Sequence, residues 1–137
     1  MMPLVIDASV VVAWAFAEQH QIAERVFALA GAEAMMAPAL WWYELRNVLV
    51  LGERRGRITE RQTARFLRDV SRLAITIDNA PDESGVLALA RRHRLTVYDA
   101  VYLELALRAA LPLATLDATL SVAARAEGVH LIGDDAA

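Results

Sequence analysis

Short apolar runs alternate with longer amphipathic stretches along the chain, and this alternation constrains the fold more than any other feature. Strands that alternate with helices form a parallel sheet covered on both faces, and continuously apolar strands suit that double burial. The predicted strands are residues 4–6, 35–37, 75–77, 113–116 and 129–132. The predicted helices, which have the 3.6-residue period, are residues 22–30, 39–55, 60–73, 83–93, 99–110 and 120–127.

The composition narrows the class of protein further. No linker, repeat or low-complexity tract interrupts the 137 residues, so we expect a single α/β domain over residues 1–137. The absence of cysteine excludes disulfides and thiolate zinc sites, and it favours a reducing environment. The opening residues make a poor signal peptide, and every apolar run is shorter than the roughly 18 residues of a membrane span. We therefore expect a cytoplasmic protein with no membrane partner.

The formal net charge of −3 works against nucleic-acid binding by the molecule as a whole. A nucleic-acid substrate would need a local basic patch or a bound metal ion. The basic side chains are all arginine, which pairs with phosphate in a two-pronged geometry, but biased codon usage is the stronger explanation of an arginine-only composition.

Two aspartates directly follow predicted strands. Asp7 ends the first strand and Asp117 follows the fourth. The carboxyl edge of an open parallel sheet is where ligands bind, at the point where the strand order reverses. Each aspartate could instead act only as the N-cap of the next helix.

Two further acids lie on the apolar faces of predicted helices. Glu44 is on the same face as Trp41 and Val48, and Asp99 is on the same face as Tyr102. A carboxylate that faces a core must be paired, hydrogen-bonded or bound to a metal. Arginine partners, Arg46 or Arg108, are the ordinary alternative. Several converging carboxylates would instead require a cation, and oxygen ligands without His or Cys select Mg²⁺ or Mn²⁺.

Other acids fit ordinary structural roles. Glu104 and Arg108 are expected to form an exposed i,i+4 pair on the outer face of their helix. Asp78 precedes a stretch with proline and acids, which is typical of a helix start. The three histidines show no ligand spacing, and we assign them no catalytic role.

With these residues identified, the chain resembles the PIN-domain ribonucleases and, within them, the VapC toxins of bacterial toxin–antitoxin pairs. The resemblance covers nearly the whole chain and rests on four segments in order. They are Val5-Ile-Asp7-Ala-Ser9, Pro38 with Glu44-Leu-Arg-Asn47, Thr96-Val-Tyr-Asp99-Ala-Val-Tyr102-Leu and Leu113-Ala-Thr-Leu-Asp117.

The resemblance implies a three-layer PIN-like fold with a central parallel sheet of about five strands. It also implies a metal-dependent endoribonuclease in which Asp7, Glu44, Asp99 and Asp117 are the catalytic, metal-binding acids. Asp7 and Asp99 would be the principal ligands of Mg²⁺ or Mn²⁺, and the metal would activate the attacking water. Supporting polar roles would fall to Ser9, Asn47 and Thr115, each of which could equally be a cap or an internally satisfied group.

Substrate and partners follow from the same resemblance. Arg54, Arg55 and Arg57 could form an RNA-binding ridge, although solvated helix faces account for such residues as well. A small cognate antitoxin and a homodimer are expected. Trp41, Trp42 and Tyr43 cannot all face inward from one helix, so at least one of these rings should be exposed or covered by another chain.

Three alternative functions use the same observations. A metal-dependent phosphatase or DNA nuclease could employ the same acids, and a catalytically silent PIN-like domain could bind only a partner or nucleic acid. A nucleotide-binding Rossmann-type protein is disfavoured, because the chain has neither G-x-G-x-x-G nor G-x-x-x-x-G-K-S/T.

Overall fold

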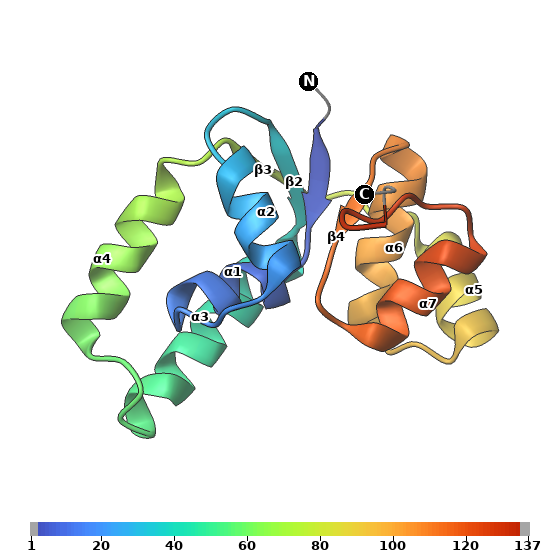
Figure 1. Ribbon diagram of the computed structural model, residues 1–137. Helices are drawn as coiled ribbons and strands as arrows, with labels where there is room; N and C mark the ends of the chain where they lie inside the picture. The colour runs from blue at the N-terminus through green and yellow to red at the C-terminus, as the bar shows by residue number, and fades with distance from the viewer. Residues whose placement is uncertain (1–2, 135–137) are drawn as a thin grey trace.

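A computed structural model describes residues 3–134 and shows a parallel sheet between two groups of helices (Figure 1). Helices α1 to α4 lie on one side of the sheet and α5 to α7 on the other. The strands are β1 Leu4–Ile6, β2 Met35–Pro38, β3 Ile75–Asp78 and β4 Leu113–Ala114. The helices are α1 Ala8–Ala15, α2 Gln21–Leu29, α3 Ala39–Arg54, α4 Glu60–Ser71, α5 Glu83–His93, α6 Val97–Ala109 and α7 Ala118–Ala126. The predicted α/β class and the covered parallel sheet are confirmed.

The strand order is β3-β2-β1-β4, and each neighbouring pair is parallel. The chain builds outward from β1 through β2 to β3, then crosses back so that β4 pairs with the other side of β1. The strand order therefore reverses between β1 and β4, which is where an open α/β sheet binds its ligand. Asp7 follows β1 and Asp117 lies three residues after β4, so both residues flank this reversal.

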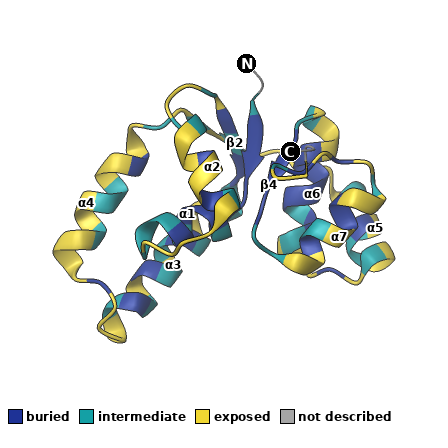
Figure 2. Ribbon diagram, in the orientation of Figure 1, coloured by how far each residue is buried: buried dark blue, intermediate teal, exposed yellow. Residues whose placement is uncertain are grey.

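The core is continuous across the sheet. All three residues of β1 are 0–1% exposed, as continuous apolar strands predict for a doubly covered sheet (Figure 2). Helix α4, in contrast to β1, is mostly exposed, and Val70 is its one buried residue. Helices α1 and α3 approach closely at Gly52, where an added Cβ would lie 2.7 Å from Cζ of Phe16. The helix that follows Asp7 and the helix that carries Glu44 are therefore packed directly together.

Two elements differ from the prediction. The valine-rich segment Ala8–Ala15 forms α1, which has no polar face and therefore gave no helical period to detect. The predicted strand at residues 129–132 reduces to one parallel bridge between Leu131 and Leu113. Because β4 is only two residues long, it offers a neighbour few backbone groups to pair with. Among residues 3–134, no helix combines the length and apolar character needed to cross a bilayer.

Candidate active site

Two hydroxyl groups donate hydrogen bonds to the Asp7 carboxylate at the point where the strand order reverses. Its Oδ2 accepts hydrogen bonds from Ser9 Oγ at 2.6 Å and from Thr115 Oγ1 at 2.7 Å. The same hydroxyl oxygens accept backbone N–H groups, Ser9 from Leu116 and Thr115 from Asp117, each at 3.0 Å. Both hydroxyl protons are thereby directed at the carboxylate. The end of β1 and the segment after β4 are tied together around one buried acid.

Asp7 and Asp117 differ in the capping role that the sequence left open for both. Asp7 occupies the N-cap position of α1, but its side chain makes no capping hydrogen bond. Asp117 is a true N-cap, because its Oδ1 accepts the backbone N–H of Leu120 at 2.8 Å. Capping uses one oxygen of Asp117 and leaves the other for a second partner.

Glu44 is half-buried on α3 and bound by a residue from the opposite side of the sheet. The hydroxyl of Tyr102, which is fully buried on α6, donates to Glu44 Oε1 at 2.7 Å. The sequence reasoning did not assign Tyr102 to the site. Its signal was its spacing, since it lies one helical turn after Asp99 on the same face of α6. Tyr102 therefore connects the helix of Glu44 to the helix of Asp99.

The electrostatics show that these acids share one negative environment. Burial is the largest cause of the raised pKa of Asp7, and the charge of Asp117 adds to it. Burial likewise raises the pKa of Glu44, with contributions from Asp7 and Asp99. For Asp99, burial together with the charges of Asp117 and Asp7 raises the pKa to about 6. Each carboxylate therefore increases the cost of ionising its neighbours.

The arginine partners considered from the sequence are engaged elsewhere. Arg46 donates to the carbonyl of Trp42 at 3.1 Å, and its guanidinium lies 3.9 Å above the Trp42 ring. Arg108 is paired with Glu104 and Asp78. Neither of these arginines neutralises Glu44 or Asp99, so the partners that the sequence suggested do not offset the negative charge of the acids.

A metal cation suits the negative charge of these acids, although the acids do not form a closed ligand cage. Within residues 3–134, no group of three or more His, Cys, Asp or Glu side chains is arranged to hold a metal ion. Mg²⁺ is usually held by one or two carboxylates and keeps several of its waters, so a closed cage is not required. The donor set consists of carboxylates and hydroxyls, which suits Mg²⁺ or Mn²⁺ and does not suit zinc.

Comparison with known proteins identifies the family of this chain. The sequence matches the PIN domain family model over residues 4–126. The chain belongs to the PIN domain family. Ribonuclease VapC3 of Pyrobaculum aerophilum is 33% identical over 124 residues, which cover 88% of this chain and 93% of that protein.

Solved structures resemble this PIN domain over most of its length. The crystal structure of PAE2754 from Pyrobaculum aerophilum has a TM-score of 0.72 and 26% identity, covering 89% of this chain and 84% of that one. A toxin-antitoxin complex from Klebsiella pneumoniae has a TM-score of 0.59 and 18% identity, covering 83% and 86%. FitAcB from Neisseria gonorrhoeae has a TM-score of 0.67 and 15% identity, covering 94% and 96%. These last two matches show the shared fold.

The remaining predicted residues of this PIN domain lie apart from the acids or on its surface. Asn47 is exposed on α3, one turn after Glu44. Arg54 is ten residues beyond Glu44 on the same helix, about 15 Å along its axis, and Arg55 and Arg57 follow it. All three arginines are exposed, and Arg57 lies over the Phe16 ring at 4.2 Å. The structure therefore does not bring this ridge to the acids.

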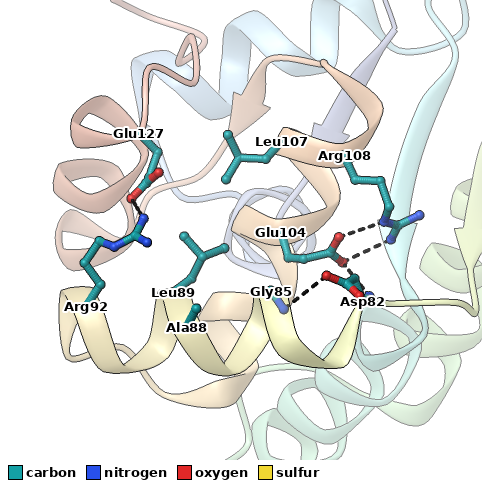
Figure 3. Close-up of a pocket in the computed structure, with 9 residues that line it drawn as sticks. All are labelled: Asp82, Gly85, Ala88, Leu89, Arg92, Glu104, Leu107, Arg108 and Glu127. Atoms are coloured by element: carbon teal, nitrogen blue, oxygen red, sulfur yellow. Dashed lines mark hydrogen bonds and ion pairs between the residues drawn. The ribbon is translucent and has the colours of Figure 1, made fainter.

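The predicted i,i+4 pair of Glu104 and Arg108 is confirmed, but the exposed position of Glu104 and the helix-start role of Asp78 were wrong. Glu104 is 5% exposed and accepts two hydrogen bonds from Arg108, at 2.7 and 3.1 Å (Figure 3). Asp78 ends β3 and accepts a further two hydrogen bonds from Arg108, at 2.7 and 3.2 Å. The residue that caps α5 is Asp82. The pair belongs to an ion-pair network that includes the buried Glu104 and joins β3 to α6.

Proposed function

We propose that this PIN domain is a metal-dependent endoribonuclease that acts as the toxin of a toxin–antitoxin pair in the cytoplasm. The observation that carries the proposal is the gathering of Asp7, Glu44, Asp99 and Asp117 at the strand-order reversal, where the two candidate arginines, Arg46 and Arg108, are engaged elsewhere. The relative named Ribonuclease VapC3, which matches 88% of the chain, supports RNA as the substrate.

Each acid has a distinct part in the proposal. Asp7 and Asp99 would hold Mg²⁺ or Mn²⁺ directly, and Glu44 and Asp117 would act directly or through water. When bound, the metal would bind the scissile phosphate and lower the pKa of a water molecule. Ser9 and Thr115 fix the orientation of Asp7 by donating to Oδ2, and the Tyr102 hydroxyl fixes Glu44. Such partners of metal-binding carboxylates keep the ligands in place.

We infer that a small antitoxin binds an apolar hollow between α2 and α4. The hollow has a volume of about 410 Å³ and is bordered by Phe27, which is 64% exposed. A solved structure with this fold is a toxin-antitoxin complex. The apolar residues that line the hollow are Trp14, Phe27, Ala30, Phe66, Val70 and Leu73.

A homodimer is a further part of this proposal, and Trp42 and Tyr43, which are 46% and 65% exposed, offer an aromatic surface for a second chain.

The proposal is tested by incubating the purified protein, free of any partner, with total RNA and with single- and double-stranded DNA. We expect new RNA 5′ and 3′ ends in Mg²⁺ or Mn²⁺, none in excess EDTA, and no cleavage of DNA. Sequencing of the ends would identify the cut sites. Cleavage of DNA alone would favour a DNA nuclease. No cleavage, together with no Mn²⁺ binding in a titration, would favour a silent binding domain.

A further inference from the structure

A hollow of about 280 Å³ lies between the end of α5 and the start of α7, and the roles above do not use it. Its lining residues are His93, Thr119, Val122 and Ala123. His93 is the last residue of α5, and residues 94–96 connect it to α6, whose first turn carries Asp99. Thr119 lies in the first turn of α7, two residues after Asp117. Each wall of the hollow is therefore close along the chain to an acid of the candidate active site, since His93 lies six residues before Asp99 and Thr119 two residues after Asp117.

The imidazole of His93 is held in one orientation. Its Nε2 lies 2.6 Å from Oε2 of Glu127, and the same oxygen accepts a hydrogen bond from Arg92 at 2.7 Å (the Arg92 contact is drawn in Figure 3). His93 and Arg92 lower the pKa of Glu127 below its usual range, so Glu127 is an ionised acceptor. The Nε2–H group therefore donates to Glu127, and Nδ1 is the ring atom left for a further hydrogen bond.

The chemistry of the hollow suits a flat, neutral ring with polar edges. Val122 is 64% exposed and gives an apolar surface, while Ala123 is buried and leaves room beside it. The Thr119 hydroxyl and the His93 ring supply hydrogen-bonding groups. None of the four lining residues is an arginine that could pair with a phosphate, whereas a nucleobase carries no charge. Apolar contact combined with polar groups at the edge is how proteins recognise unpaired bases in RNA.

We propose that this hollow, which we call the α5–α7 hollow, binds one unpaired nucleobase adjacent to the phosphate that is cut, and that His93 and Thr119 recognise its edge. The inference rests on the ribonuclease activity proposed above and identifies its substrate as single-stranded at that position. Bases within an A-form duplex cannot enter the hollow, because they are stacked and paired. His93 and Thr119 are thus specificity-determining residues, and Asp7 and Asp99 remain the metal-binding ones.

The test uses synthetic single-stranded RNAs that match a mapped cut site and differ only in one base on either side of the cut. The full-length wild-type protein should prefer one base at one of these positions. Thr119→Val, which removes the hydroxyl and keeps the shape, should reduce that preference about tenfold, the effect of one lost hydrogen bond to the base. Thr119→Ser should retain it. His93→Ala should also reduce the preference.

Thr76→Val is the matched control, because Thr76 is exposed on β3, at the opposite edge of the sheet from β4. This variant should keep the wild-type preference. Mn²⁺ affinity should be unchanged in all four variants. If the wild type cuts RNA with a base preference that Thr119→Val leaves intact, the hollow does not bind the base. If the wild type cuts no RNA, the proposed function itself fails.

Discussion

The molecule contains two groups of acidic side chains, and they are stabilised in opposite ways. In one, Asp78 and Glu104 surround Arg108, which donates to both carboxylates. In the other, hydroxyl groups donate to Asp7 and a phenol donates to Glu44, while the charges of neighbouring carboxylates act on Asp7, Glu44 and Asp99. Arg108 lowers the pKa of Asp78, while burial and neighbouring charges raise the pKa values of Asp7, Glu44 and Asp99.

Under the proposed function, the difference separates a structural group from a functional one. The charge of a carboxylate that is paired with arginine is offset within the folded protein, so the carboxylate requires no bound ion. Carboxylates gathered without a cation cost folding free energy unless an ion binds them, so their persistence points to a ligand. The two groups can therefore be distinguished by activity and by the sign of stability changes.

The largest expected effect is on RNA cleavage by Asp7→Asn. We expect activity to fall by more than about 100-fold, because even outer partners of a metal ligand contribute up to that amount. Initial rates on a mapped RNA would measure the change. Asp78→Asn is the matched control and should keep activity within a few fold, since Asp78 serves Arg108. Equal losses in the two variants would contradict the distinction between the groups.

The next largest effect concerns stability. Arg108→Met should lower the free energy of unfolding by about 2 kcal/mol, because the buried Glu104 would lose its charged partner. The value is below that of a fully buried pair, since Arg108 is 37% exposed. Urea unfolding followed by circular dichroism would measure it. Arg54→Met, at an exposed position near the end of α3, serves as the control and should change stability little.

The smallest effect is a pH dependence of the metal-free protein. The folded pKa of Asp99 is about 6, above its usual 3.8, so the folded state holds the proton more tightly than the unfolded state. Its stabilising contribution is full below about pH 3.8 and is lost as the pH rises through about 6. In EDTA, the urea concentration at the unfolding midpoint should therefore decrease as the pH is raised from 5 to 7.5. Addition of Mg²⁺ should restore the higher midpoint.

Asp99→Asn supplies the control for this pH dependence. The variant has no proton to lose at this position, so its urea midpoint in EDTA should depend less on pH than that of the wild type. An identical pH slope in the two proteins would show that Asp99 does not carry the effect.

The sequence predicted the elements whose pattern is local and periodic. The strands at residues 4–6 and 35–37 and the helix at residues 83–93 could be recognised because burial on both faces, or on one face, leaves a regular apolar pattern. Helix α1 could not, because it is apolar on all sides and has no period. The 129–132 segment looked like a strand, but pairing depends on the length of β4, which no local pattern encodes.

The positions of the four acids were also predictable from local patterns in the sequence. Strand ends and apolar helical faces indicated Asp7, Asp117, Glu44 and Asp99, since these positions are fixed by chain direction and helical spacing. The partners of the acids were harder to predict. Arg108 could reach Glu104 within its own helix, but its bond to Asp78 spans 30 residues and depends on how α6 packs against β3. The Tyr102–Glu44 bond spans 58 residues and is equally invisible in the local sequence.

The double role of Asp117 has a consequence for inheritance. Its Oδ1 caps α7, and an asparagine at this position has a side-chain oxygen that can cap the helix in the same way. Aspartate and asparagine codons differ by one nucleotide, so one point mutation can remove a charge from the acidic group while preserving the fold. Under the proposed function, a single mutation could inactivate this toxin in a cell that still produces a folded protein able to bind its antitoxin.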